Sequence, residues 1–339
     1  MSVLVTGGAG FIGSNFVRRS LEDAYPVTRG AAVTVLDRLT YAGNLDNLAP
    51  VRDDPRLRFV RGDVRDASLV RDLMAEATTV VHFAAETHVD RSIDGASEFV
   101  STNVVGTQVL LDAALEAGVE RFLLVSTDEV YGSADEGAWT EDSPLLPNSP
   151  YSASKAAADH MARAYFRTHG LPVVTVRTSN NYGPYQHPEK LIPLFTTRLL
   201  EQRTVPLYGD GGNVREWVHV DDHCRGIALA LEHGAPGGVY NIGSEDRVGN
   251  IDIATALVRL TGADLSLVRR VADRKGHDRR YALDSTRART ELGHRPRVPL
   301  DQGLAETVEW YRRHRAWWSP SASAVPTPRP VAQKGTSHA

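Results

Sequence analysis

Cysteine is nearly absent from this sequence of 339 residues, since Cys224 is the only one. One cysteine cannot form an internal disulfide, which fits a reducing compartment, and we predict a cytoplasmic protein. Cys224 lies close in sequence to His219 and His223, and such a group can be taken for a metal site. A lone cysteine is more often a small buried side chain on a helix, so we predict no metal.

Long apolar runs and an excess of either charge are also lacking. No stretch approaches the roughly 20 consecutive apolar residues that a membrane-spanning helix needs. The N-terminus has no secretory layout, because residues 2–6 run directly into a glycine turn. With 38 basic and 42 acidic residues, the formal net charge is −4. We therefore predict neither a membrane nor a nucleic-acid partner.

The first 24 residues combine a β-rich run, a glycine turn and a helical stretch. This order is typical of dinucleotide binding. Gly7 permits a tight turn, Gly10 lets the backbone approach the pyrophosphate, and Gly13 lets helix and strand pack closely. The helix N-terminus attracts the phosphates. The alternative is a glycine turn that serves packing alone.

A second β-rich run ends at Asp37, 24 residues after Gly13. An acid about 20 residues after the glycines is expected to bond the ribose 2′-hydroxyl of the cofactor. Because such an acid repels the 2′-phosphate of NADP, we predict NAD. NADP remains the alternative, because Arg38 follows Asp37 and a nearby arginine can accept the 2′-phosphate.

Further β-rich runs alternate with helical stretches, at residues 57–60, 79–83, 122–125 and 171–177. Such alternation predicts a parallel sheet with right-handed crossovers, and the length suffices for about two domains. We predict an α/β fold with a Rossmann-type doubly wound parallel sheet and a smaller, mixed α/β C-terminal substrate domain. The expected parts are residues 1–178, residues 179–318 (from which some segments return to the sheet) and a flexible tail at residues 319–339.

Two acids and a hydroxyl follow the apolar run at residues 122–125. Thr127, Asp128 and Glu129 are expected at the carboxyl end of that strand, where open α/β sheets bind ligands. Grouped carboxylates raise one another's pKa. Tyr151 and Lys155 are four residues apart and are expected on one face of a helix. Because an ammonium beside a phenol favours the phenolate, Tyr151 is a candidate base in an enzyme that moves several protons.

The remaining part of the chain is less regular. Asp221 is a candidate N-cap for a helix that reaches about residue 233. A basic cluster at residues 269–280 suits a diphosphate, and the alternative is a solvated basic face. From Ser319 onward the chain is rich in Ser, Pro, Thr and Ala, and we predict that this tail is disordered and inert.

These motifs together resemble a known family. The glycine turn and the Tyr151-x-x-x-Lys155 pair are similar to those of the extended short-chain dehydrogenase/reductases. Within that group the sequence resembles the dTDP-glucose 4,6-dehydratases, through residues 84–92, 126–132, 180–186, 189–193, 206–211, 215–217 and 273–278. The Asp128-Glu129 pair distinguishes this family from two related ones. Sugar-nucleotide 4-epimerases have no acid pair there, and GDP-mannose dehydratases carry a different pair and use NADP. Thr87 replaces the family's usual Ser, and Lys275 replaces a common Pro.

The resemblance implies a redox-neutral lyase that converts dTDP-glucose to dTDP-4-keto-6-deoxyglucose in deoxysugar biosynthesis. Tyr151, with Lys155 and Thr127, is then expected to take the proton from the hydroxyl on carbon 4 while hydride passes to NAD. Glu129 is expected to remove the proton on carbon 5. Asp128, kept protonated, is expected to protonate the departing hydroxyl on carbon 6, and the hydride then returns to carbon 6.

The resemblance also implies the binding residues. Those for the cofactor are Gly7, Gly10, Phe11, Ile12, Gly13, Asp37, Arg38, Leu39, Thr40, Asp63, Val64, Ala84, Ala85, Thr102, Tyr151, Lys155 and Asn181. Those for the substrate are Thr87, Thr127, Asp128, Glu129, Asn180, Lys190, Leu191, Pro206, Leu207, Tyr208, Arg215, Asn250, Arg274 and His277. A homodimer is implied as well, formed through the helix around residues 96–117 and the helix that opens at Tyr151.

Three other functions compete with this interpretation. One is another nucleotide-hexose 4,6-dehydratase, and a second is a 4-epimerase, against which the Asp128-Glu129 pair argues. The third is a non-catalytic NAD-binding regulator on the same fold, because a fold does not determine a function. Such a regulator is expected to have lost at least one of the five catalytic residues, and this sequence retains all of them.

Overall fold

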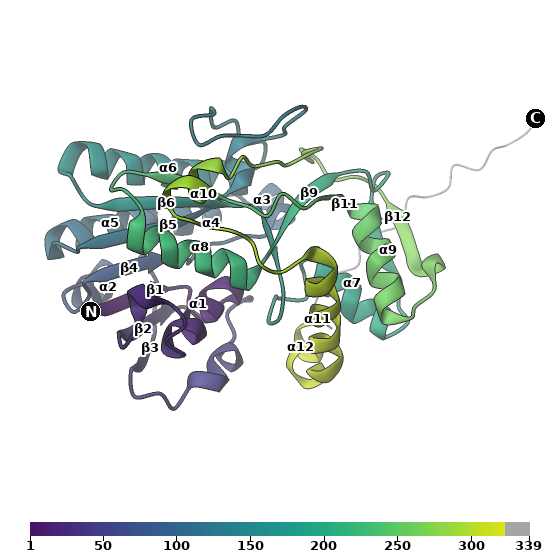
Figure 1. Cartoon of the computed structure of the whole chain (residues 1–339), viewed down its shortest axis with the longest axis horizontal. Helices are drawn as coiled ribbons and strands as arrows, with labels where there is room; N and C mark the ends of the chain where they lie inside the picture. Colours follow the sequence, from purple (N-terminus) through teal and green to yellow (C-terminus); the bar gives the residue numbers. More distant parts are fainter. Residues whose placement is uncertain (323–339) are drawn as a thin grey trace, which may run out of the picture.

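The computed structural model describes residues 1–322, and its largest element is a sheet of seven strands (Figure 1). The strands run in the order β10-β6-β5-β4-β1-β2-β3, and every neighbouring pair is parallel. The carboxyl ends of the strands therefore lie at one edge of the sheet. The strand bounds are β1 Ser2–Thr6, β2 Ala32–Asp37, β3 Leu57–Arg61, β4 Thr79–His82, β5 Arg121–Thr127, β6 Val173–Thr178 and β10 Val239–Ile242.

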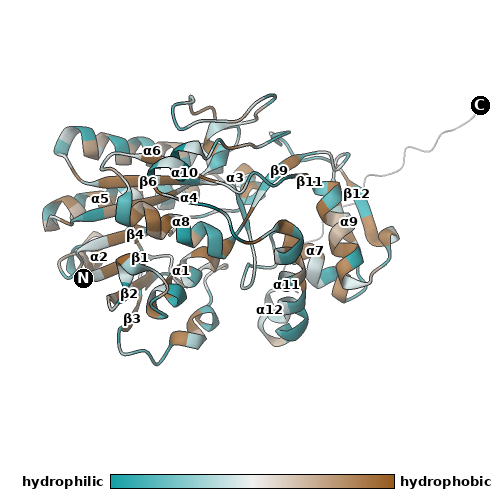
Figure 2. Cartoon of the chain, in the orientation of Figure 1, coloured by the Kyte–Doolittle hydropathy of each residue, from teal (hydrophilic) through white to brown (hydrophobic). Residues whose placement is uncertain are grey.

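Helices cover both faces of this sheet. Helices α1 (Phe11–Leu21) and α8 (Val220–His233) pack on one face, and α2 (Ala67–Met74), α5 (Gly106–Ala117) and α6 (Pro150–His169) pack on the other. Strand β5 is buried on both sides, at every residue but its first. Figure 2 shows apolar residues concentrated in the strands of this sheet. Burial from both sides is typical of doubly wound parallel sheets, and the predicted Rossmann-type fold is confirmed.

A smaller assembly of strands and helices lies beside the large sheet (Figure 1). It has a three-stranded sheet in the order β11-β9-β7 and a two-stranded sheet of β12 and β8. The apolar core of this part includes Tyr182, Phe195 and Trp217. The bounds are β7 Asn180–Tyr182, α7 Leu191–Leu200, β8 Val205–Tyr208, β9 Val214–His219, β11 Arg247–Gly249, α9 Asn250–Thr261, β12 Val268–Val271 and α11 Leu300–Arg313.

Between these elements the chain returns to the large sheet. Helix α8 packs on one face of it, and β10 pairs with β6 at its edge. The remaining elements are short, and the active site draws on several of them. They are η1 Pro26–Thr28, η2 Leu45–Val51, α3 Val89–Asp94, α4 Ser97–Phe99, η3 Val100–Val105, η4 Asp128–Tyr131, η5 Leu265–Leu267, α10 Thr286–Glu291 and α12 Arg315–Ala322.

Helix α8 begins differently from the prediction. Its N-cap is His219, whose ring Nδ1 accepts a hydrogen bond from the Asp221 backbone N–H at 3.3 Å. The Asp221 carboxylate instead accepts hydrogen bonds from Asn15 Nδ2 (2.9 Å) and Arg19 Nη2 (2.6 Å) on α1. The predicted N-cap was wrong because a charged partner on α1 binds this carboxylate.

Two further segments differ from expectation. The helix expected around residues 96–117 consists of α4, a π-helical segment η3 and α5. Turns of π-helix are often found at functional sites. Residues 319–322, which we expected in the tail, belong to α12, where Trp318 is buried. The rest of the predicted tail, residues 323–339, lies outside the described residues.

Candidate active site

Two cavities lie side by side and share lining residues. One, of about 300 Å³, extends along the carboxyl ends of the large sheet. The other, of about 650 Å³, lies between that edge and the smaller assembly. The residues that line both are Glu129, Asn180, Asn181, Gln186, His187, Glu189 and Lys190. The smaller cavity is called the sheet cavity below, and the larger one the outer cavity.

The sheet cavity is lined by every residue predicted for the cofactor except Leu39. Leu39 has a backbone φ of 56° and donates its N–H to Asp37 Oδ1 at 2.8 Å. The other Asp37 oxygen accepts the Ala9 N–H at 2.9 Å. Leu39 therefore helps to hold Asp37 at the end of β2 through its backbone and does not face the cavity.

The glycine turn leaves room that larger residues would fill. Gly7 has φ +70°, and a Cβ there would lie 2.6 Å from the Ala84 backbone nitrogen. A Cβ on Gly13 would lie 2.3 Å from the Gly7 carbonyl oxygen, so this glycine allows the close packing of α1 on β1. The N-cap of α1 is Gly10, no side chain caps this helix, and its first turn contains no acid. The N–H groups of its first turn therefore remain available to an anion.

The residues of the sheet cavity fit a dinucleotide. Thr102 Oγ1, on the π-helical segment η3, is buried and has no partner among the described residues, which leaves it for a ligand. Arg38 is held away from an incoming phosphate, because its Nη1 lies 3.0 Å from Glu98 and 3.3 Å from Asp63. Together with Asp37, this arrangement favours a ribose without a 2′-phosphate, as in NAD.

The Thr127-Asp128-Glu129 stretch follows β5 directly, as predicted. Thr127 is the N-cap of η4, and its Oγ1 accepts the Glu129 N–H at 3.2 Å. The same hydroxyl lies 3.2 Å from Asp128 Oδ1, while Asp128 Oδ2 is buried without a partner among the described residues. One oxygen of Asp128 is thus free to exchange a proton with a ligand in the sheet cavity, which Asp128 lines.

The two acids differ in their surroundings. Burial raises the pKa of Asp128 well above its ordinary value, and the carboxylates of Glu129 and Glu216 raise it further. Burial also raises the pKa of Glu129, but the positive charges of Arg274, Arg215 and Lys190 act in the opposite direction. Asp128 is therefore the acid that stays protonated more readily.

Tyr151 and Lys155 lie in the first turns of α6, on the helix where they were predicted, and both line the sheet cavity. The expected lowering of the Tyr151 pKa is not found. Burial raises the pKa of this phenol well above its ordinary value, and the charges of Glu129 and Asp128 raise it further, while a hydrogen bond with Thr127 lowers it. Lys155 donates from Nζ to the Val125 carbonyl oxygen at 2.7 Å, and burial lowers the pKa of Lys155 to about 8.

The outer cavity gathers most of the residues predicted for the substrate. The members that line it are Glu129, Asn180, Lys190, Leu191, Pro206, Leu207, Tyr208, Arg215, Asn250, Arg274 and His277. Thr87, Thr127 and Asp128 line the sheet cavity instead. The predicted set therefore spans both cavities, and Glu129, Asn180 and Lys190 lie where they meet.

Several cationic and polar groups of the outer cavity are held in place but keep atoms that have no hydrogen-bond partner among the described residues. Arg215 is buried, lies 4.2 Å from the centre of the Tyr281 ring and donates from Nη2 to the Asp278 carbonyl oxygen at 2.9 Å. Arg274 Nε is buried without a partner among the described residues, and so are the Oδ1 atoms of Asn180 and Asn250. A buried donor or acceptor without a partner costs free energy. Such groups are therefore expected where a polar ligand supplies the missing partner.

Several residues that line the outer cavity were not predicted from the sequence, among them Tyr41, His187, Glu189 and Tyr281. The Glu189 side chain is 3% exposed and lies 3.6 Å from His88 Nε2, where the cavities meet. The sequence motif at Glu189-Lys190 could have indicated it, but only Lys190 was predicted to bind the substrate. Tyr281 and Tyr41 carry no local signal, because their contacts with Arg215 and Arg91 come from distant segments.

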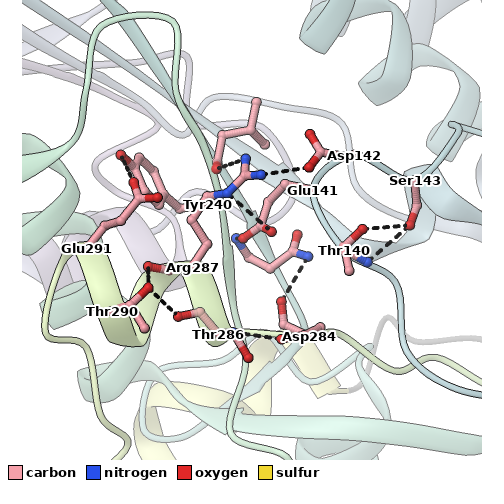
Figure 3. A network of polar contacts seen from close by, with 12 residues as sticks. Thr140, Glu141, Asp142, Ser143, Tyr240, Asp284, Thr286, Arg287, Thr290 and Glu291 are labelled. Atoms are coloured by element: carbon pink, nitrogen blue, oxygen red, sulfur yellow. Dashed lines mark hydrogen bonds and ion pairs between the residues drawn. The ribbon is translucent and has the colours of Figure 1, made fainter.

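The loop between the catalytic segments is anchored to the edge of the large sheet (Figure 3). The Glu141 side chain is 4% exposed and accepts the Asn241 backbone N–H of β10 at 2.8 Å. Arg287 on α10 reaches the same loop, with Nη2 2.8 Å from Asp142 Oδ2. Because this loop joins η4 to α6, the anchor helps to set the position of Glu129 relative to Tyr151.

No helix among residues 1–322 is long and apolar enough to cross a membrane. In that same part of the chain, no group of three or more His, Cys, Asp or Glu side chains is arranged to hold a metal ion. Cys224 is fully buried on α8, with its Sγ 3.5 Å from the Ile12 carbonyl oxygen. This is the buried helical role that we expected of it.

Comparisons with known proteins show the family of this chain. Residues 4–307 match the family model described as GDP-mannose 4,6 dehydratase. A dTDP-glucose 4,6-dehydratase from Streptomyces niveus is 58% identical, over 95% of this chain and 96% of the relative. Another, from Streptomyces antibioticus, is 60% identical, over 94% of this chain and 95% of the relative. The chain belongs to the dTDP-glucose 4,6-dehydratase family, within the extended short-chain dehydrogenase/reductases.

Solved structures place the family on a widely shared fold. The crystal structure of the dTDP-glucose 4,6-dehydratase DesIV from Streptomyces venezuelae, with NAD bound, is 62% identical. It matches with a TM-score of 0.93 over 94% of this chain and 99% of that one. A UDP-glucose 4-epimerase from Thermotoga maritima is 33% identical and still matches with a TM-score of 0.85, over 92% and 99% of the two chains. The fold is thus common to dehydratases and epimerases, and the side chains of the site must distinguish them.

Proposed function

We propose that this chain catalyses the redox-neutral dehydration of dTDP-glucose to dTDP-4-keto-6-deoxyglucose. The observation that carries the proposal is the Asp128-Glu129 pair, in which Asp128 is buried: both acids line the sheet cavity with Tyr151 and Lys155, and Glu129 lines the outer cavity as well. An epimerase needs no acid pair, because it transfers hydride without eliminating water. The 58–60% identity to dTDP-glucose 4,6-dehydratases supports the same substrate.

NAD is the proposed cofactor, held by the residues that line the sheet cavity. When bound, NAD accepts a hydride from sugar carbon 4, later returns it to carbon 6, and carries a positive charge on its oxidised ring. The first turn of α1 would hold the pyrophosphate and Asp37 the adenine ribose, and Tyr151, Lys155 and Thr102 line the same cavity.

Proton transfer begins at the hydroxyl on carbon 4. Tyr151 takes this proton as general base; burial raises the pKa of the phenol, and the hydrogen bond with Thr127 offsets part of that rise. Lys155 donates a hydrogen bond to the Val125 carbonyl oxygen and supplies a positive charge close to the sheet cavity. The resulting ketone at carbon 4 makes the hydrogen on carbon 5 acidic.

Elimination of water then needs one base and one acid. Glu129, whose carboxylate is stabilised by Arg274, Arg215 and Lys190, removes the proton from carbon 5. Asp128, whose pKa burial and the neighbouring carboxylates raise, gives its proton to the departing hydroxyl on carbon 6. Glu129 afterwards returns a proton to carbon 5, and the proton that Tyr151 took from the carbon 4 hydroxyl makes up for the one that Asp128 gave away, so the net reaction is the loss of one water molecule.

The outer cavity is the proposed place of the nucleotide diphosphate. Arg215 and Arg274 present guanidinium groups there, and such groups bind phosphate oxygens with charge-assisted hydrogen bonds. Pro206, Leu207 and Tyr208 form the end of β8 on the same wall and are the proposed contacts of the thymine base.

A cytoplasmic homodimer is the proposed form of the protein. The proposed interface pairs η3, α5 and α6 with the same elements of a second copy. Val100 and Val105 on η3 support it, because these apolar side chains are 49% and 45% exposed in the single chain. Covering them in a dimer removes apolar surface from water.

The test is incubation of the purified protein with dTDP-glucose in deuterated water, without added reductant, followed by mass spectrometry of the product. A dehydratase gives a product that has lost one water and gained one deuterium, since carbon 5 is reprotonated from solvent-exchanged Glu129. An unchanged mass with galactose stereochemistry identifies an epimerase. Turnover of UDP-glucose or GDP-mannose in place of dTDP-glucose keeps the chemistry and overturns the substrate.

A further inference from the structure

Two buried histidines behind the active site take no part in the mechanism above. His223 on α8 and His294 after α10 have no exposed surface. Three of their four ring nitrogens have no hydrogen-bond partner among the described residues. The fourth, His223 Nδ1, lies 2.9 Å from Asn181 Oδ1. Because buried polar groups normally have partners, the one contact that His223 makes points to its role.

The direction of this hydrogen bond follows from the other contacts of Asn181. Its Nδ2 donates to the Ser179 carbonyl oxygen and to Thr178 Oγ1, each at 3.0 Å. A carbonyl oxygen only accepts, so the amide nitrogen must face Ser179 and the amide oxygen must face His223. That oxygen cannot donate. His223 therefore carries its proton on Nδ1 and donates it to Asn181.

These contacts leave the Asn181 side chain with one lone pair, on Oδ1, that has no partner among the described residues. Both amide N–H bonds are taken, and His223 occupies one of the two lone pairs of Oδ1. Its backbone carbonyl oxygen accepts from Gln186 Nε2 at 2.8 Å. Asn181 lines both cavities, as Glu129 does. Its side chain can thus offer a ligand only a hydrogen-bond acceptor.

We propose that His223 is a positioning residue, which holds the Asn181 amide so that the second lone pair of Oδ1 accepts a carboxamide N–H of the nicotinamide ring. This inference rests on the proposed function, which places NAD in the sheet cavity. The nicotinamide end is the part expected beside Glu129, because the reacting carbon must lie near the acid pair. The adenine end is expected near Asp63 and Val64, which line the same cavity.

Two substitutions at one position separate the hydrogen bond from packing and polarity. The amide nitrogen of His223→Asn occupies the place of the imidazole Nδ1 and can still donate to Asn181. The longer side chain of His223→Gln carries its amide where Nε2 was, so it is equally polar but misses Asn181. Each variant is freed of cofactor and titrated with NAD, and the quenching of protein fluorescence reports the dissociation constant.

The expected result is a split between the two variants. His223→Gln weakens NAD binding about tenfold, the effect of losing roughly one hydrogen bond, whereas His223→Asn stays within about threefold of the wild-type chain. Equal losses in the two variants would overturn the proposal, because packing alone would then explain them. His294→Gln is the control for disturbing the same buried region, and it should leave the NAD dissociation constant unchanged.

A cofactor analogue identifies the group that Asn181 binds. In 3-acetylpyridine adenine dinucleotide a methyl ketone replaces the carboxamide, so the N–H donor is lost. The wild-type chain should bind NAD about tenfold more tightly than this analogue, and His223→Gln should bind the two nearly alike. An undiminished preference for NAD in His223→Gln refutes the role. A wild-type chain that binds neither dinucleotide refutes the proposed function itself, and the inference with it.

Discussion

Asp128 and Glu129 are adjacent in the chain and differ in the charges that surround them. Asp128 is 2% exposed, has one carboxylate oxygen without a partner among the described residues, and lies close to the charges of Glu129 and Glu216. Glu129 faces the cations Arg274 and Arg215. Two identical functional groups can therefore hold different protonation states, which an acid and a base acting in one elimination step require.

Replacing Glu129 by Gln should separate oxidation from dehydration. The amide cannot remove the proton from carbon 5, while Tyr151 still serves carbon 4. We expect the near-ultraviolet absorbance of reduced cofactor to build up with dTDP-glucose, and dehydrated product to fall by about 10²-fold or more, the usual worth of a general base. Normal dehydration by this variant would show that another group removes the carbon 5 proton.

Replacing Tyr151 by Phe should stop the reaction before any cofactor is reduced. Loss of the base at carbon 4 should lower both the reduced-cofactor signal and the product, by about 10²–10⁴-fold. Tyr240→Phe, which removes a phenol bonded to Glu291 at the far edge of the sheet (Figure 3), is the matched control and should keep full turnover. Reduced cofactor formed at the normal rate by Tyr151→Phe contradicts the assignment.

Replacing Asp128 by Asn should stabilise the protein in a pH-dependent way. The folded-state pKa of Asp128 is raised by burial and by the nearby carboxylates. The native state therefore holds this proton more tightly than the unfolded chain, whose aspartates titrate near pH ~3.9, and stability is lost as pH rises above that value through the folded pKa. The neutral amide avoids this loss.

We expect the melting temperature of Asp128→Asn to exceed that of the wild type at pH 7, by roughly 2–4 °C for each kcal/mol relieved, and the difference to vanish toward pH ~4. Thermal unfolding followed by circular dichroism at several pH values measures it. Asp53→Asn, at an exposed carboxyl, is the control and should show no such trend. A variant less stable than the wild type at pH 7 contradicts the expectation.

Replacing Glu98 by Gln should shift cofactor preference slightly toward NADP. Glu98 and Asp63 hold the Arg38 guanidinium, and a weaker hold frees it for a ribose 2′-phosphate. Both side chains of the Arg38–Glu98 pair are about half exposed, so the expected gain in NADP affinity relative to NAD is only about two- to threefold. Adding Arg38→Ala should cancel the gain in titrations of the cofactor-free protein.

Replacing Glu141 by Ala should destabilise the protein by about 1–3 kcal/mol. The change leaves the Asn241 backbone N–H of β10 without its acceptor and loosens the loop that joins η4 to α6. Glu141→Gln keeps an acceptor oxygen and should lose less than half as much. Urea unfolding measures both, with Asp142→Ala as the comparison, because that change removes only an ion pair with Arg287 whose acid is 82% exposed, and such pairs contribute little. Equal effects of Glu141→Ala and Asp142→Ala contradict the anchoring role.

Much of the fold and part of the site follow from local sequence. Apolar runs of strand length, alternating with helical stretches, predict the parallel sheet, because strands covered on both faces need apolar residues on both sides. Gly7 and Gly13 are required by contacts within the first helix and strand and with the neighbouring strand. Thr127 at the end of β5, and Tyr151 and Lys155 on one face of α6, follow from the geometry of single elements.

Local sequence therefore predicts which groups are present and at which strand end or helix face each one lies. Their protonation and hydrogen bonding depend on how distant segments pack together. Glu216 and Arg274 approach the acid pair from segments roughly 80 to 150 residues away, as the sequence separations show. His223 reaches Asn181 across 42 residues. Charge, burial and hydrogen-bond direction depend on distances between such segments, and no local pattern encodes those distances.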